Sequence, residues 1–240
     1  MSGGIGPTTK DIAVPSEGSG GDTIAIPEHH PHHRFLSLRQ LNTLAVSIVL
    51  AASGMVAAGD IIIVFSSLPY IIFLSRYAFP PLHPSQSVEP PIFGAGNRLI
   101  AVYVAIGALL GLLLPIAYIF EGIMEGDKEG IKAAVPHVFL LASQVFMEGV
   151  TFSHHFSLPI RAFVPISFNA LRMFTLIDWV MVELNKEAIA GGEQWSALRL
   201  LVGKGLAVAN FVFWAFNLFG FLLPVYLPRA LKRHYGDKEK

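Results

Sequence analysis

Six apolar stretches, separated by connectors that carry charge or proline, run along the chain from residue 41 to residue 227. Three of them contain no charged residue, namely Ile61 to Ser75, Leu99 to Phe120 and Gly205 to Leu227. A helix of about 20 residues rises about 30 Å, which matches the hydrocarbon core of a bilayer. The pattern therefore predicts an all-α fold, a polytopic transmembrane helical bundle with six spans, over residues 41–58, 61–78, 99–120, 133–152, 162–182 and 203–227.

The first two stretches are separated only by Gly59 and Asp60. A single straight helix from Arg39 to Arg76 would be about 57 Å long, too long for one crossing. We therefore expect the helix to break at Gly59 and Asp60, because glycine can end one helix and aspartate can cap the next. If residues 41–78 instead form one span plus a re-entrant segment, the bundle has five spans.

The chain divides into a membrane domain and two tails. Residues 1–33 are rich in Gly, Ser, Pro and Thr, so they offer little apolar surface to bury and are expected to form a disordered cytosolic tail. Residues 34–228 are expected to form the transmembrane helical domain. Its last span should stop at Pro224 and Pro228, because proline does not continue a helix. Residues 229–240 then form a basic cytosolic tail.

Composition agrees with this class of protein. Hydrophobic residues make up 53% of the chain and charged residues 14%, a more apolar balance than soluble domains show. The chain has no cysteine, which excludes disulfides and thiolate catalysis. The expected partner is the lipid bilayer, together with other membrane proteins or further copies of this chain, and nucleic acid is not an expected partner.

Lysine and arginine gather on alternate connectors, which predicts the orientation. With the N-terminus in the cytosol, eleven of them lie on the cytosolic side and five on the opposite side, in agreement with the positive-inside rule. We therefore expect both termini in the cytosol, with the chain in an endomembrane or the plasma membrane. The eleven are Lys10, Arg34, Arg39, Arg76, Arg98, Arg161, Arg229, Lys232, Arg233, Lys238 and Lys240, and the five are Lys128, Lys132, Lys186, Arg199 and Lys204.

Polar side chains inside the spans mark where a function would reside. On the fourth span, His137, Gln144 and Glu148 are spaced by seven and four residues, so they share one face of a helix. The fifth span carries Asn169 and Arg172. Side chains tilt toward the N-terminus of their own helix, so in antiparallel neighbours we expect Arg172 to converge on Glu148 and pair with it.

Asp178 lies about 120° around the helix from Arg172 and so requires another partner. Lys204, at the start of the sixth span, is the expected one. Such pairs can merely neutralise each other and fix helix packing, or they can line a pathway for a substrate or a proton. On the third span, Gly107 and Gly111 form a G-x-x-x-G pattern that permits close helix approach.

Enzyme motifs are not found in the sequence. It contains no P-loop, no dinucleotide fingerprint and no zinc-protease or hydrolase motif. His154 and His155 form one adjacent pair, whereas membrane di-iron enzymes need several spaced histidine boxes, so neither a metal site nor another cofactor is expected. The histidines near the end of the first tail can bind a transition metal weakly, although a solvated linker is the favoured interpretation; they are His29, His30, His32 and His33.

Residues 146–187 read FMEGVTFSHHFSLPIRAFVPISFNALRMFTLIDWVMVELNKE. This stretch resembles a plant multispanning membrane protein family that carries only a domain-of-unknown-function label. The resemblance implies a plant source and a single membrane domain, but no activity, ligand or catalytic residue. We therefore expect an integral membrane protein without catalytic activity, acting as a membrane organiser or partner subunit. The alternative is a small transporter or channel subunit that uses the polar residues of the fourth and fifth spans.

Overall fold

The computed structural model describes residues 37–81, 98–152, 156–186 and 197–236, and in these segments the chain is helical without strands. Its elements are α1 (Leu38–Ala52), α2 (Ala58–Tyr77), α3 (Arg98–Ala108), η1 (Leu109–Leu113), α4 (Leu114–Glu125), α5 (Lys128–Thr151), α6 (Leu158–Asn185), α7 (Ala197–Ala215), η2 (Phe216–Tyr226) and α8 (Leu227–Gly236), where η denotes a π-helix.

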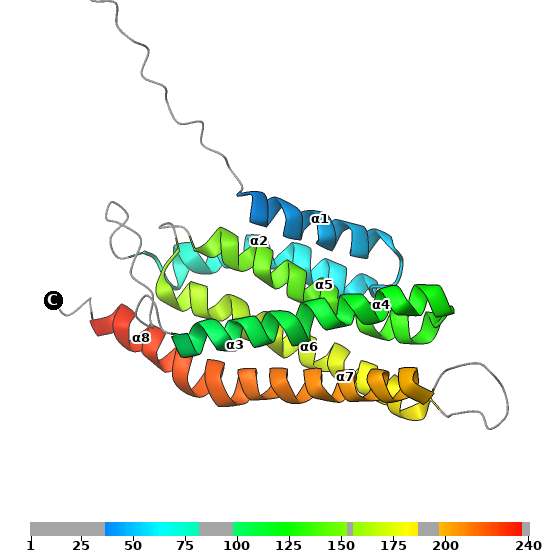
Figure 1. The fold of residues 1–240 in the computed structure, drawn as a ribbon. Coiled ribbons are helices and arrows are strands. Elements are labelled where there is room, and N and C mark those ends of the chain that lie inside the picture. The colour runs from blue at the N-terminus through cyan, green and yellow to red at the C-terminus, as the bar shows by residue number, and fades with distance from the viewer. Residues whose placement is uncertain (1–36, 82–97, 153–155, 187–196, 237–240) are drawn as a thin grey trace, which may run out of the picture. The chain divides into compact units, whose positions relative to one another are not determined.

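Because α3, η1 and α4 are continuous, as are α7, η2 and α8, the described elements form six helical passes that lie side by side (Figure 1). Five passes are long and apolar enough to cross a membrane by length and composition, whereas α1 has only 15 residues. The predicted all-α helical bundle is confirmed, and the chain is an integral membrane protein.

The first hairpin turns earlier than the sequence suggested. Helix α1 begins with a capping box between Ser37 and Gln40, and it ends at Ser53, next to Gly54, whose φ is +73°. Glycine adopts this left-handed conformation without strain, which stops the helix. The predicted break at Gly59 and Asp60 was therefore wrong. Both residues lie in the first turn of α2, where the carboxylate of Asp60 interacts favourably with the helix dipole.

Helices α5 and α6 form the centre of the bundle. They make the most extensive helix contact, and α1 and α4 pack on α5 while α7 packs on α6. Most of α5 and α6 is buried, whereas α2 and the α3–α4 pass expose most of their length. The outer passes therefore shield the buried polar groups of the central helices, such as His137, Asn169 and Arg172, from the bilayer.

The last pass is longer than the sequence indicated. It runs as one helix from Ala197 to Gly236, so the predicted stop at Pro224 and Pro228 was wrong. Pro224 lies inside η2, and a π-helix bonds each N–H five residues back, which moves aside the carbonyl that a proline ring would meet in an α-helix. The segment expected to be a tail continues as α8, and Ala230 packs against Leu158 and Ala162 of α6.

Charge is divided between the two ends of the described bundle. The end at which α2 finishes and α3 and α6 start carries the basic residues Arg76, Arg98, Arg161, Arg229, Lys232 and Arg233, and we name it the basic end. The opposite end carries both signs, with Asp60, Glu121, Glu125, Asp127, Lys128, Glu129, Lys132, Asp178, Glu183, Lys186, Arg199 and Lys204, and we name it the mixed-charge end. The orientation in which the basic end faces the cytosol stays a prediction from the positive-inside rule.

Two lysine-to-cysteine variants test this orientation, because the chain has no cysteine of its own. Lys128 is exposed at the mixed-charge end and Lys232 is exposed at the basic end. In sealed vesicles of known orientation, we expect a membrane-impermeant thiol reagent to label Lys128→Cys only from the non-cytosolic side and Lys232→Cys only from the cytosolic side. Both variants should label fully once detergent opens the vesicles. Labelling of both from the same side would contradict the topology.

Candidate functional site: an intramembrane cavity

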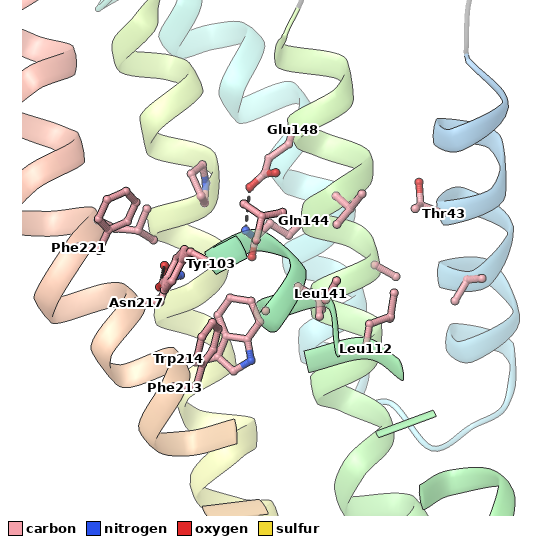
Figure 2. A pocket seen from close by; sticks show the side chains of 18 of the residues that line it. Thr43, Tyr103, Leu112, Leu141, Gln144, Glu148, Phe213, Trp214, Asn217 and Phe221 are labelled. Carbon is pink, nitrogen blue, oxygen red and sulfur yellow. Dashed lines mark hydrogen bonds between the residues drawn. The ribbon is translucent and has the colours of Figure 1, made fainter. Parts of the chain in front are cut away.

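A cavity of about 450 Å³ lies between α1, the α3–η1 segment, α5 and the α7–η2 segment (Figure 2). Its wall is mainly aliphatic and aromatic, with a few polar side chains. The described lining residues are Asn42, Thr43, Val46, Ile100, Tyr103, Val104, Gly107, Ala108, Leu112, Ile116, Leu141, Ala142, Gln144, Val145, Glu148, Pro165, Phe213, Trp214, Asn217, Phe221 and Leu222.

Both π-helical segments of the described chain border this cavity. Leu112 reaches it from η1, while Asn217 and Phe221 reach it from η2. Tyr103 of α3 spans the two walls, because its hydroxyl donates to Asn217 Oδ1 at 2.7 Å. Interruptions of this kind in α-helices occur frequently at functional sites. Their presence on two walls of one cavity makes it the leading candidate site.

Polar side chains of α5 and α6 donate hydrogen bonds to backbone carbonyls in or next to the two π-helical segments. A change from α- to π-type bonding leaves carbonyls without their usual helical N–H partner. The Nε2 atom of His137 lies 3.0 Å from the carbonyl oxygen of Gly111 in η1, and Asn169 Nδ2 donates to the carbonyl of Trp214 at 3.1 Å, just before η2. Because a carbonyl can only accept, Nε2 of His137 carries the hydrogen. These two side chains therefore stabilise the walls of the cavity.

Arg172 and Glu148 come to one place but do not contact each other. The Nη2 atom of Arg172 donates to Gln144 Oε1 at 2.8 Å, and Gln144 Nε2 donates to Glu148 Oε1 at 2.8 Å, as the dashed line in Figure 2 shows. The predicted direct ion pair was therefore wrong. A primary amide presents a donor and an acceptor at once, so Gln144 joins the guanidinium to the carboxylate.

The guanidinium of Arg172 lies behind the cavity wall. It is fully buried, 3.8 Å from the centre of the Trp214 ring, and Nη2 also donates to Asn169 Oδ1 at 3.3 Å. A cation over the face of a tryptophan is stabilised by the ring quadrupole. Trp214 itself lines the cavity, whereas Arg172 does not belong to the described lining, so the positive charge lies behind this ring.

Gly107 and Gly111 permit close approach, but to aromatic side chains of α7. A Cβ atom on Gly111 would lie 2.5 Å from the Trp214 ring, and one on Gly107 would lie 3.3 Å from the Phe213 ring. The first contact is closer than real Cβ atoms tolerate, so Gly111 makes room for Trp214. The glycine pattern therefore permits close packing on this pass, but the groups that pack against the two glycines are aromatic rings and not the backbone of a partner helix.

Asp178 and Lys204 form no pair within the described part of the chain, so that prediction was wrong. Asp178 lines a second cavity of about 390 Å³ at the mixed-charge end, together with Asp60 and Lys132, and no described residue of α7 belongs to that lining. The face of α6 that meets α7 presents Glu183 instead, since a Cβ atom on Gly203 of α7 would collide with its carboxylate. Asp178 and Glu183 are five residues apart and so point about 140° away from each other around α6.

Residues 36–235 match the model of a family described as a Domain of unknown function (DUF7733). The chain belongs to this family. No curated protein and no solved structure matches the chain. The resemblance to a family of unknown function is confirmed, while the plant source stays a prediction. The DUF7733 region contains both cavities and nearly all of the six passes, so the site described above belongs to the family domain.

A charge network at the mixed-charge end of the DUF7733 domain is the main feature that the sequence did not reveal. Lys186 Nζ lies 2.8 Å from Asp127 Oδ2 and 2.7 Å from Glu183 Oε1. Arg199 Nη2 lies 3.0 Å from Asp127 Oδ2, and the Tyr118 hydroxyl donates to Glu183 Oε1 at 2.6 Å. We name these five residues the charge network. It joins the α4–α5 turn to the end of α6 and the start of α7.

Asp127 is the centre of the charge network. Its carboxylate accepts hydrogen bonds from Lys186, from Arg199 and from the backbone N–H of Gly130, so it also caps α5. Burial by itself raises the pKa of the Asp127 carboxyl, but these three donors outweigh burial and hold the pKa below its ordinary value. The carboxylate is therefore ionised at neutral pH.

Three glycines leave room for the side chains of the charge network. Their positions are a signal in the sequence that could have indicated this close packing. A Cβ atom on Gly122 would lie 2.8 Å from Arg199 Nη2, one on Gly130 would collide with the Tyr118 hydroxyl and the Asp127 carboxylate, and one on Gly203 with Glu183. The sequence placed these charges in solvated connectors. His154 and His155, for which no metal site is expected, and the histidines of the first tail lie outside the described residues.

Proposed function

We propose that this integral membrane protein binds a small amphipathic molecule within the bilayer, in the cavity between α1, α3, α5 and η2. The observation that supports the proposal is the cavity itself. Its volume of about 450 Å³ falls in the range of about 300 to 1,000 Å³ that small-molecule sites occupy. An apolar wall with a few convergent polar groups is likewise typical of such sites.

Access from the bilayer is supported by the helices that flank the cavity. Val104 of α3 lines the cavity and is 59% exposed, and Val46 of α1 lines it and is 41% exposed. In a bilayer these exposed side chains face lipid. A molecule dissolved in the membrane can therefore reach the cavity between α1 and α3 without crossing water.

The alternative from the sequence is a transporter or channel subunit. Transport begins with binding of the transported molecule, so a ligand site in this cavity is compatible with that alternative. An organiser or partner subunit would use the outer passes, where α2 exposes apolar side chains such as Phe65 and Phe73. Contact with lipid requires the same exposure, so that surface favours neither a protein partner nor the bilayer. The cavity is the more specific feature, and binding without a catalytic step is our conclusion.

Filling the cavity from its mouth tests the proposal. In Val104→Phe the larger ring extends into the cavity, and we expect the affinity for an amphiphile to fall by about tenfold or more. Val102 lies two residues away on the same helix, is 56% exposed and does not belong to the described lining, so Val102→Phe is a matched control that should leave affinity unchanged.

Quenching of tryptophan fluorescence by a dibrominated long-chain alcohol, with the protein in nanodiscs, measures binding. A Trp195→Phe background leaves emission from Trp179 and Trp214, which are both buried and therefore shielded from bulk lipid. Saturable quenching is expected, because bromine in the cavity lies against Trp214. Equal loss of affinity in Val104→Phe and Val102→Phe, or quenching that never saturates, would contradict a specific site.

A further inference from the structure

We infer that the ligand of the cavity is a neutral amphiphile with a hydroxyl headgroup, a long-chain or sterol-like alcohol, and not a fatty acid. This inference rests on the proposed function, since it concerns the same cavity. It follows from the charge of the lining, from the depth of the polar groups and from the hydrogen bonds that they can make.

The lining carries a single charged side chain, Glu148, among the residues that the structure describes. A carboxylate headgroup would lie beside a second carboxylate in an apolar cavity, where like charges repel strongly because the surroundings screen them poorly. Arg172 cannot pair directly with such a headgroup. It stands behind Gln144 and Trp214 and is not part of the lining.

A hydroxyl headgroup fits the same set of atoms. It can donate to Glu148, because a carboxylate has about four acceptor positions and Gln144 occupies one of them, so other partners of Glu148 can coexist with the ligand. The hydroxyl oxygen can in turn accept from the second amide hydrogen of Gln144 or from the amide of Asn42, which lines the cavity on the side of α1. All polar groups of such a ligand are then satisfied.

The depth of the lining residues gives the ligand a direction. Glu148 lies three residues before the end of α5, about 5 Å along the helix axis, and Thr43 lies five residues after the start of α1. Both ends belong to the basic end of the bundle. Leu141 and Ile116 lie deeper, toward the middle of the bilayer. The headgroup therefore lies near the membrane surface and the chain points inward, as in the lipids of that leaflet.

Two probes with the same chain and different headgroups test the inference, namely dibrominated stearyl alcohol and dibrominated stearic acid. Quenching in nanodiscs is measured at alkaline pH, where the fatty acid is ionised. We expect the alcohol to bind about tenfold more tightly than the acid. Dibrominated stearylamine is the third probe, and tighter binding of the amine than of the alcohol would overturn the choice of a neutral headgroup.

The variant Glu148→Gln tests whether the Glu148 carboxylate causes the preference for the alcohol over the fatty acid. The amide keeps the shape and removes the charge, so the preference for alcohol over acid should shrink to about threefold or less. Glu129→Gln, an exposed carboxylate at the mixed-charge end, is the control and should keep the full preference. If Glu148→Gln does not fold, competition in the unchanged protein replaces it, and unlabelled stearyl alcohol should displace the brominated alcohol while stearate should not.

The outcomes separate the two proposals. Saturable quenching by alcohol and acid with equal affinity would overturn the hydroxyl headgroup and leave the binding site intact. Saturable quenching by neither alcohol, acid nor amine would overturn the proposed function as well. A preference that survives Glu148→Gln unchanged would show that Glu148 does not select the headgroup.

Discussion

Replacement of Arg172 by alanine is expected to lower the free energy of unfolding by about 3 to 5 kcal/mol, because it truncates a large, fully buried side chain and leaves its hydrogen-bond partners unsatisfied. The guanidinium is fully buried, and it holds Gln144 and Asn169 by hydrogen bonds while it covers the ring of Trp214. Its removal leaves the carbonyl oxygen of Gln144 without its donor and leaves a space beside Trp214. Arg76, exposed at the end of α2, is the matched control. Arg76→Ala should change stability by less than about 0.5 kcal/mol.

A double-mutant cycle tests whether the charge of Arg172 is coupled to that of Glu148. The combination of Arg172→Ala with Glu148→Ala should recover part of the loss, because no half-buried carboxylate is then left without the nearby cation. Since Gln144 carries the link, the same cycle in a Gln144→Leu background should show little coupling. Unfolding by heat or denaturant in detergent gives the free energies. Strictly additive losses in the original background would show that the two charges are independent.

Neutralisation of Asp127 is expected to have the second-largest effect. Asp127→Asn keeps the size and the ability to cap α5, yet it leaves Lys186 and Arg199 with one carboxylate fewer in a buried network. We expect a loss of about 3 kcal/mol. Asp127→Ala should lose about 1 kcal/mol more, because alanine cannot accept the hydrogen bond from the N–H of Gly130. Equal stability of the aspartate and asparagine forms at neutral pH would show that the charge network does not stabilise the fold.

The difference in stability between the unchanged protein and Asp127→Asn should disappear at acid pH. The fold depresses the pKa of Asp127, so its contribution to stability is fully present above the ordinary aspartate pKa and is lost as pH falls through the lower pKa of the folded state. Below about pH 4 the stability of the unchanged protein should therefore approach that of Asp127→Asn. Glu129→Gln, which removes an exposed neighbouring carboxylate, should show no comparable convergence. A gap that stays constant from neutral to acid pH would contradict the depressed pKa.

The sequence alone was sufficient for the class of fold. Stretches such as Leu99 to Phe120 contain no charge over the length of a bilayer crossing, and this property is local, since each segment must satisfy its own backbone in lipid by forming a helix. The segregation of charge between the two ends was equally visible, because it depends only on which connector carries each lysine or arginine. Helix ends were harder to place. Either Gly54 or Gly59 could end the first helix as judged from the sequence, and the structure distinguishes them because Gly54 has a positive φ.

The tertiary structure decided which polar groups meet. Sequence spacing placed His137, Gln144 and Glu148 on one face of α5, but the rotation and relative depth of α6 determined that Arg172 reaches Gln144 and that Glu183, not Asp178, faces α7. These parameters depend on side-chain packing across the whole interface, so a small rotation exchanges one partner for another. The cavity depends on the same packing, since it lies where η1 and η2 depart from α-helical geometry. Hydrophobicity along the chain determined that the helices form, whereas contacts between helices determined which polar side chains pair and where the cavity lies.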